Sequence, residues 1–101
     1  MQDPILRKIL LAFIQVHILY HAKKEPIYGS WMIEELKNHG YDISPGTLYP
    51  IFHSMEKDGL LISKKQQVNG KIRKYYSITP MGAENLISAN EKIKELSHEI
   101  K

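Results

Sequence analysis

Two histidines form the pattern in this chain that comes closest to a metal or catalytic site. His17 and His21 are four residues apart within an apolar stretch. On a helix this spacing brings both imidazoles to one side, where they could hold a metal ion. The sequence shows no third ligand near them. We therefore predict no bound metal and assign both histidines to an interface.

Enzyme chemistry has no candidate residues in this sequence. The chain has no cysteine nucleophile, no glycine-rich phosphate loop and no paired carboxylates, and its serines have no identifiable base with an orienting partner. We predict that the protein is not an enzyme, that it has no catalytic residues and that it uses no cofactor.

The segment from Ser44 to Leu61 offers recognition chemistry instead. Pro45 suits the first position of a helix, Ser44 is expected to cap it through its side chain, and Gly59 predicts its end. Its apolar residues recur on one side, and the opposite side is small, hydroxylated or basic, which suits a DNA groove. An ordinary surface helix is the alternative interpretation. The residues expected to contact DNA are Ser44, Thr47, Tyr49, Pro50, His53 and Lys57.

Roles within this helix can be assigned by side-chain type. Thr47, Tyr49 and His53 are predicted to read bases, and Ser44 or the helix N-terminus is predicted to hold a phosphate. Pro50 leaves the start of the helix open, because a proline costs little in the first turn but removes one hydrogen bond further inside.

A basic strip follows the helix. Residues 59–83 contain five basic residues and no acid, and Asn69-Gly70 at their centre predicts a two-stranded hairpin. A basic hairpin after a recognition-type helix predicts a wing that binds a polyanion; lysines that keep a hairpin edge solvated are the alternative. The basic residues are Lys64, Lys65, Lys71, Arg73 and Lys74, and Tyr28 and Ser30 are expected to add backbone contacts.

Three further helices are predicted to position these groups. One runs from Asp3-Pro4 to about Ala22, one from Gly29-Ser30 to Gly40 with Ser30 as its cap, and the last begins at Thr79-Pro80. The fold is predicted to be mainly α (α+β), a winged helix-turn-helix. Residues 1–80 would form the DNA-binding unit and residues 81–101 the dimerisation helix, in one compact body.

The first helix is apolar on two sides, and the last carries an apolar seam at spacings of three and four residues. A second apolar side needs a second cover, which in so short a chain favours a homodimer. A helix packed on its own core is the alternative. The residues expected at the dimer interface are Leu11, Ile14, Ile18, Leu86, Ala89, Ile93, Leu96 and Ile100.

The composition is that of one soluble domain. The chain has 101 residues, 43% apolar and 25% charged, with a net charge of +3 and no cysteine. No apolar run reaches the roughly 18 residues of a membrane span. Asp3 and Pro4 precede the apolar run, unlike a signal peptide. We predict a cytoplasmic protein with no membrane partner.

The chain resembles the PadR family of transcriptional regulators, in its compact branch with a short C-terminal helix. The matching segments are Pro26–Gly29, Ile43–Pro50, Glu56–Leu60 and Gly70–Gly82. The resemblance implies a repressor that binds double-stranded DNA as a homodimer on a palindromic operator. In some compact members an aromatic residue of the last helix stacks on planar ligands, but here that helix has none. Multidrug binding is therefore not carried over.

Two alternatives stay open. A winged helix can serve as a protein-interaction module without operator specificity, its wing binding an acidic partner. The dimer interface can also form a pocket for an unidentified small-molecule effector. The candidate walls of such a pocket are Phe13, Tyr20 and Trp31.

Overall fold

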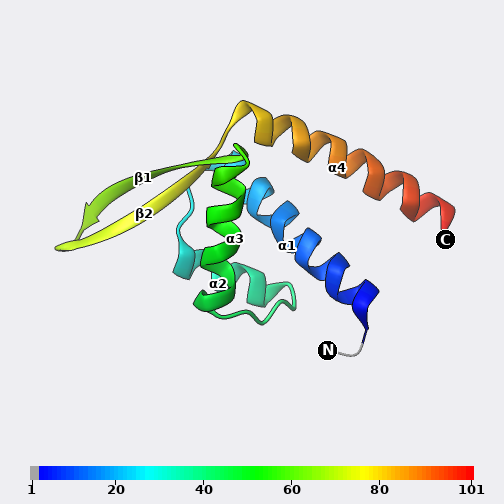
Figure 1. The fold of residues 1–101 in the computed structure, drawn as a ribbon, viewed down its shortest axis with the longest axis horizontal. Helices are drawn as coiled ribbons and strands as arrows, with labels where there is room; N and C mark the ends of the chain where they lie inside the picture. Colours follow the sequence, from blue (N-terminus) through cyan, green and yellow to red (C-terminus); the bar gives the residue numbers. More distant parts are fainter. Residues whose placement is uncertain (1–2) are drawn as a thin grey trace.

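The structure is a computed structural model and describes residues 3–101, so the first two residues of the predicted 1–80 unit lie outside it. Four helices surround a core, and a two-stranded antiparallel hairpin projects from one side of it (Figure 1). The winged helix-turn-helix predicted from the sequence is confirmed. The elements are α1 (Pro4–Lys24), α2 (Gly29–Asn38), α3 (Pro45–Lys57), β1 (Leu61–Val68), β2 (Lys71–Ile78) and α4 (Pro80–Glu99).

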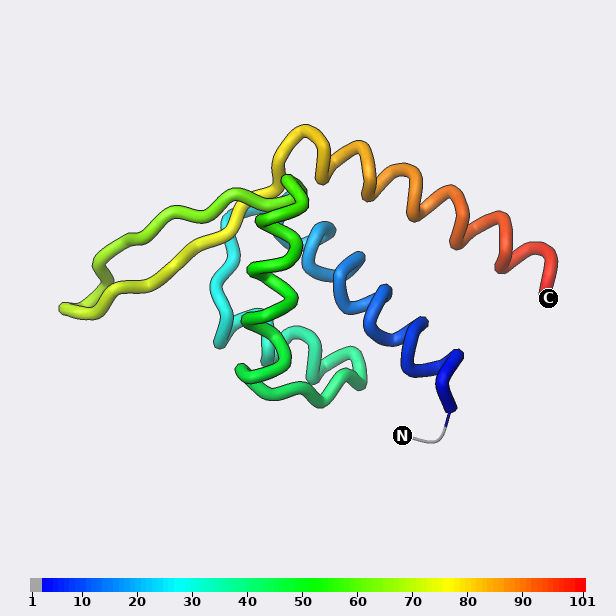
Figure 2. Tube along the Cα trace, in the orientation of Figure 1, coloured from blue at the N-terminus to red at the C-terminus, as the bar shows by residue number. Residues whose placement is uncertain are grey.

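The trace in Figure 2 shows how α1 and α4 are arranged. They run antiparallel and in contact, and they lie on the side of the molecule away from the hairpin. The start of α1 and the end of α4 come out on the same side of the fold. The hairpin and these two helical ends therefore lie on opposite sides of the molecule.

The predicted helix caps at Asp3 and Thr79 are confirmed. The Asp3 carboxylate accepts from the backbone N–H of Leu6 at 3.0 Å, and the Thr79 hydroxyl accepts from the N–H of Gly82 at 3.0 Å. Each of these bonds satisfies a donor of the first turn that has no helical acceptor.

The predicted cap at Ser30 is wrong. α2 begins at Gly29, within the predicted Gly29-Ser30 start, and the cap position is held by Tyr28, two residues before Ser30. The cause is Ile27, which exchanges two backbone hydrogen bonds with Tyr76 of β2, at 2.9 and 2.7 Å. This bridge keeps the chain extended up to Tyr28, so the helix starts directly after it.

The open question around Pro50 is answered by the bounds of α3. The helix begins at Pro45, which leaves Pro50 inside it. Ser44 occupies the cap position, but among the described residues its side chain caps no backbone N–H; its hydroxyl lies 3.4 Å from that of Thr47. Gly59 ends the helix at φ +83°, a left-handed conformation that suits glycine.

The wing has the register that Asn69-Gly70 predicts. These two residues have φ values of +53° and +80°, as a two-residue hairpin turn requires. Cross-strand partners run from Leu61 opposite Ile78 to Val68 opposite Lys71. Because side chains alternate along a strand, Lys65 and Lys74 share one face of the wing, and Lys64 and Arg73 share the other.

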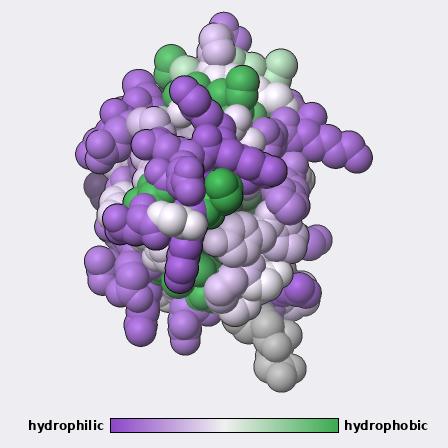
Figure 3. All heavy atoms as spheres, turned by 90° about the vertical axis from the view of Figure 1, so that its left-hand side faces the viewer, coloured by the Kyte–Doolittle hydropathy of each residue, from purple (hydrophilic) through white to green (hydrophobic). Residues whose placement is uncertain are grey.

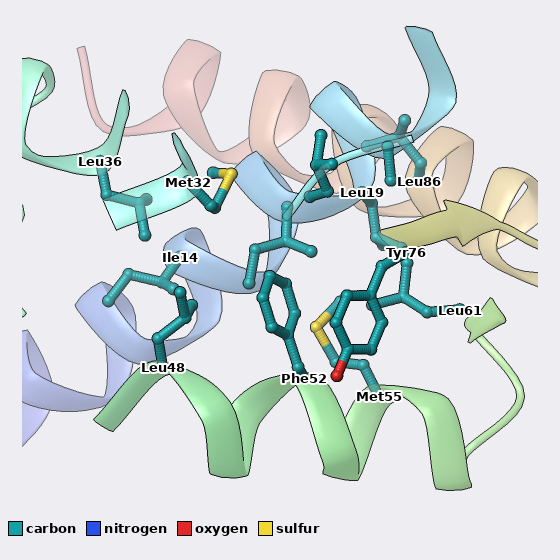
Figure 4. Packing of buried hydrophobic residues seen from close by; sticks show 13 residues of the cluster. Ile14, Leu19, Met32, Leu36, Leu48, Phe52, Met55, Leu61, Tyr76 and Leu86 are labelled. Atoms are coloured by element: carbon teal, nitrogen blue, oxygen red, sulfur yellow. The ribbon is translucent and has the colours of Figure 1, made fainter. Parts of the chain in front are cut away.

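The core is built on the inner side of α3, as Figure 4 shows. Leu48, Phe52 and Met55 are all buried and point toward α1, α2 and β2. The Phe52 ring stacks on Tyr76 of β2 with centroids 4.2 Å apart. Burying side chains of this size stabilises the fold by about 1.5–3 kcal/mol each, so α3 is held firmly by its apolar side.

Part of the predicted dimer interface belongs to this core instead. Ile14, Ile18 and Leu86 are 3%, 0% and 4% exposed. All three lie in the hydrophobic core of a single chain. They therefore have no exposed surface that a second copy could contact. The side of α1 that carries Ile14 and Ile18 was predicted to face a second copy, but these two residues face the core.

α1 is long and apolar enough to cross a membrane by length and composition alone, with a mean hydropathy of 1.3 over its most apolar window. The same test is passed by a core helix of a soluble protein. Here α1 contacts α2, α4 and β2, and Ile14, Ile18, Leu19 and Ala22 are buried in the core.

Candidate nucleic-acid interface

The outer side of α3 presents the side chains that the sequence assigned to DNA. Ser44, Thr47, Tyr49, Pro50, His53 and Lys57 are all exposed. They lie opposite the buried apolar residues of the same helix. This side combines hydroxyl, imidazole and ammonium groups, which can donate hydrogen bonds to base edges and phosphates.

A hollow of about 560 Å³ joins α3 to two other elements. It lies between the start of α2, the middle of α3 and the tip-proximal half of the wing. Its walls include most of the predicted wing cations and one residue of the recognition helix. The predicted site residues that it brings together are Tyr28, Ser30, Tyr49, Lys71, Arg73 and Lys74.

Other predicted residues lie outside this hollow. Ser44, Thr47, Pro50, His53 and Lys57 are spread along α3, and Lys64 and Lys65 lie on β1. We use the term recognition surface for the hollow together with the outer side of α3. Lys64 faces a different depression, beside Glu25 and Tyr75.

Arg73 is the best-positioned cation of the wing. Its guanidinium lies 4.0 Å from the centroid of the Tyr28 ring and donates to the Tyr75 hydroxyl at 3.4 Å. The hydrogen bond to Tyr75 raises the pKa of Arg73, so the group keeps its charge. The rings of Tyr28 and Tyr75 meet edge to face at 5.4 Å. This contact joins the wing to the start of α2 while leaving a positive charge on the hollow.

Tyr49 is positioned by a glycine. A methyl group built at Gly29 would overlap the ring and hydroxyl of Tyr49, so only glycine lets this ring lie against the start of α2. Tyr49 also meets Phe52 edge to face at 6.3 Å and stays 41% exposed. The start of α2 therefore determines where the main aromatic side chain of the recognition surface lies.

Glu56 positions the wing, and the sequence analysis did not assign it this role. Its carboxylate accepts from the Ser63 hydroxyl at 2.7 Å and from the Ser63 N–H at 3.2 Å, and it lies 3.9 Å from the Lys74 ammonium. The available signal was its place in the last turn of a helix, where the helix dipole disfavours an acid. Glu56 fixes the base of the wing against α3.

Figure 3 shows the molecule from the side toward which the wing points. This face is mostly hydrophilic, with separate apolar patches between the polar groups. On the wing itself Ile62 and Ile72 are 61% and 68% exposed. A polar, cationic surface with scattered apolar groups is typical of a nucleic-acid interface.

Comparison with known proteins identifies the family. A model of the transcriptional regulator PadR-like family matches residues 18–88, which run from the last part of α1 into the first half of α4. This chain belongs to the PadR-like family. The resemblance seen in the sequence is confirmed, and the protein is a winged-helix DNA-binding regulator of transcription.

Relatives of this PadR-like protein support the assignment over nearly its whole length. Transcriptional regulator Rv3488 of Mycobacterium tuberculosis is 41% identical over 95 residues, which cover 94% of this chain and 89% of the relative. A PadR-like transcription factor from Bacteroides fragilis is 29% identical, with a TM-score of 0.83 over 97% of this chain and 96% of that one. A PadR-like transcriptional regulator from Bacillus cereus is 29% identical, with a TM-score of 0.82 over 92% of each chain. Proteins of this kind are generally not enzymes.

The PadR-like protein also has a cavity of about 500 Å³ on the side away from the wing. α1, the end of α2 and α4 surround it. Phe13 and Tyr20, two of the predicted ligand-pocket walls, line it, but Trp31 does not. Trp31 lies near the start of α2 and lines a smaller depression beside Tyr28. Its ring meets that of His21, a wall of the cavity, edge to face at 5.3 Å.

The expectation that His17 and His21 have no third ligand nearby is wrong. His39, directly after α2, places a ring nitrogen close to theirs. The sequence separates His39 widely from the other two, and only the packing of α2 across α1 brings the three together.

Proposed function

We propose that this PadR-like protein is a homodimeric repressor that binds a palindromic operator in double-stranded DNA. α3 of each copy would enter a major groove, and each wing would follow the flanking backbone. The observation that carries the proposal is the hollow in which Tyr49, the start of α2 and the wing cations share one surface. Groups that read bases and groups that hold phosphates are thus adjacent.

The wing would supply most of the affinity that does not depend on sequence. Its cations can neutralise phosphates and release counterions, which makes binding fall steeply as salt rises. Arg73, Lys71 and Lys74 reach the hollow, whereas Lys64 and Lys65 would contact the backbone further along. Tyr28 and Ser30 at the start of α2 would add backbone contacts, since helix N-termini favour phosphate.

Base choice would come from α3. Thr47, Tyr49 and His53 carry the hydrogen-bonding groups that reach groove edges, and Pro50 and Lys57 lie on the same exposed side. Ser44, whose hydroxyl is not used as a helix cap within the described residues, is free to donate to a phosphate at the helix start.

Dimerisation would use a groove between α1 and α4. It has a volume of about 340 Å³ and is lined mainly by apolar side chains. Ile93, Leu96 and Ile100, three of the predicted interface residues, stand on it at 38%, 53% and 73% exposure. Leu11 and Ala89 lie on the same two helices and are at least partly exposed. Unpartnered apolar surface of this kind marks an interface.

The proposed repressor acts in the cytoplasm by binding DNA, and it has no enzymatic activity. A small-molecule effector is a second candidate feature, because the cavity beside Phe13 and Tyr20 opens toward the same α1–α4 side as the dimer groove. Trp31 fluorescence reports on that cavity through the Trp31–His21 contact. An unchanged signal across a broad ligand panel would count against the effector.

Selection of bound fragments from random DNA tests the main proposal. The full chain is incubated with random duplexes, bound fragments are sequenced, and the enriched site is titrated with salt. We expect an enriched palindrome, bound by two chains and weakened steeply by salt. Sequence-blind binding would instead support a winged-helix module whose wing binds an acidic protein partner.

A further inference from the structure

Three histidines from two helices meet beside the cavity on the α1–α4 side. His17 and His21 lie one turn apart on α1, and His39 follows the last turn of α2. One ring nitrogen of each lies within 4.8 Å of the others. The rings of His17 and His39 are 4.7 Å apart. The pair on α1 therefore has the third imidazole that a metal site needs.

A carboxylate completes the group. An oxygen of Glu35 lies 3.3 Å from a ring nitrogen of His21 and 3.1 Å from one of His39. The Glu35 side chain is 23% exposed, so its carboxylate has a fixed place between the two rings. Glu35 can either bind an ion directly or orient the imidazoles that do, as carboxylates beside metal-binding histidines commonly do.

The two histidines on α1 are partly buried. Burial, and then the neighbouring His39, lower the pKa of His17. Burial lowers the pKa of His21 as well, more than Glu35 raises it. A neutral imidazole has the lone pair that a metal ion needs.

We propose that His17, His21 and His39, together with Glu35, bind one divalent transition-metal ion of the zinc class per chain. Imidazole and carboxylate ligands suit zinc, nickel, cobalt and copper, and the chain has no cysteine that would favour a softer ion. Four ligands are the number that a tetrahedral zinc ion takes.

The three histidine rings need to move only slightly to bind one ion. Nitrogens bound to one tetrahedral zinc ion lie about 3.3 Å apart, given zinc–nitrogen bonds of about 2.05 Å. The ring nitrogens here lie within 4.8 Å of one another, so small side-chain rotations bring them into range. His39 is exposed and has room to rotate.

The proposed site is independent of the recognition surface. It lies at the end of α2, whereas Tyr28, Gly29 and Ser30 at its start line the hollow near the wing. An ion there would tie the end of α2 to α1 and so raise the unfolding temperature. Metal binding can thus fail or succeed without deciding whether the protein binds an operator.

Titration of the metal-free full chain tests the site. Co²⁺ is added first, because tetrahedral coordination gives it strong visible absorption, and Zn²⁺ binding is then measured by calorimetry. We expect one ion per chain and a higher unfolding temperature with Zn²⁺. His39→Gln should weaken binding at least about 100-fold, because loss of even an outer partner of a metal ligand costs 10–100-fold. His98→Gln, an exposed histidine on α4, is the matched control and should leave binding unchanged.

A second ligand variant, Glu35→Gln, protects the test against misfolding. His39 and Glu35 lie at the end of α2, so Glu35→Gln provides a ligand change that keeps the size of the side chain. It should weaken Zn²⁺ binding about tenfold or more while the metal-free unfolding temperature shows that the chain is folded. Undetectable binding in the micromolar range, equal affinity for wild type and His39→Gln, or half an ion per chain would each overturn the proposal.

Discussion

The two ends of α2 are built from different chemistry and serve different sides of the molecule. At its start, Gly29 accommodates Tyr49, and the Tyr28 ring holds the Arg73 guanidinium. At its end, Glu35 and His39 meet two histidines of α1. The start lies beside the cations of the wing, and the end places three imidazoles near one carboxylate. A helix of 10 residues thus separates the recognition surface proposed for DNA from the cavity proposed for a metal ion.

The recognition surface and the cavity side both depend on the hydrophobic core that lies between them. α3 carries the recognition surface outward and packs its apolar side toward α1, α2 and β2. The cavity side depends on the same α1–α2 packing. Changes in the core should therefore damage both sides, and changes at either surface should damage one.

Phe52→Ala should have the largest effect and should damage both sides together. Phe52 is fully buried and stacks on Tyr76, so its loss leaves a cavity between α3 and β2. We expect the free energy of unfolding to fall by about 3–5 kcal/mol. Urea unfolding followed by circular dichroism measures it. An unchanged midpoint would mean that α3 is not held by this contact.

Ile93→Asp should damage the side away from the wing. Ile93 lies on both the cavity and the α1–α4 groove, where an unpaired carboxylate would be buried in a dimer. We expect the dissociation constant of the dimer to increase at least about 100-fold, since burying an unpaired charge costs several kcal/mol. Sedimentation at several concentrations measures it.

Ile87→Asp is the matched control for this change. Ile87 is 55% exposed on the same helix and is not a wall of the groove. Equal weakening of the dimer by both variants would place the interface elsewhere on α4.

Much of the recognition side could be predicted from the sequence because its determinants are local. The inner positions of α3 and the Asn69-Gly70 turn depend on neighbours within a few residues. The same is true of the caps at Asp3 and Thr79, which begin the two helices on the other side. Periodicity and turn chemistry report such neighbours directly. The assignment of the exposed α3 residues to DNA stays a prediction until binding is measured.

The cavity side could not be predicted in the same way because its determinants are tertiary. Which apolar side of α1 faces inward depends on where α2 and α3 pack, so Ile14 and Ile18 were placed on the wrong side. His39 and Glu35 reach His21 only across two helices. The cap of α2 was misplaced for the same reason, because the Ile27–Tyr76 bridge joins residues far apart in the chain.

Tyr49→Ala should weaken operator binding selectively. It removes the aromatic side chain that lies between the outer side of α3 and the start of α2. We expect operator affinity to fall by about 1–3 kcal/mol, the range of a good base contact, with little change for random DNA. Fluorescence anisotropy with both duplexes measures it.

Tyr49→Phe separates contact from support in this prediction. It removes only the hydroxyl and keeps the ring against Gly29 and Phe52. If the phenylalanine variant loses as much operator affinity as the alanine variant, the hydroxyl is the reading group. If it loses none, the ring supports its neighbours. Equal losses for operator and random DNA would contradict a role in base choice.

Arg73→Ala should have the smallest effect on discrimination and should weaken all DNA alike. Removing one phosphate contact is expected to lower the slope of log affinity against log salt by about one. Arg73→Lys keeps the charge but loses the planar contact with Tyr28 at 4.0 Å, so it should keep the slope near that of wild type. Lys94→Ala, an exposed cation on α4, should change neither the slope nor the affinity. If Arg73→Lys lowers the salt slope as much as Arg73→Ala does, Arg73 acts through its contact with Tyr28 and not through its charge alone. The start of α2 would then position the wing.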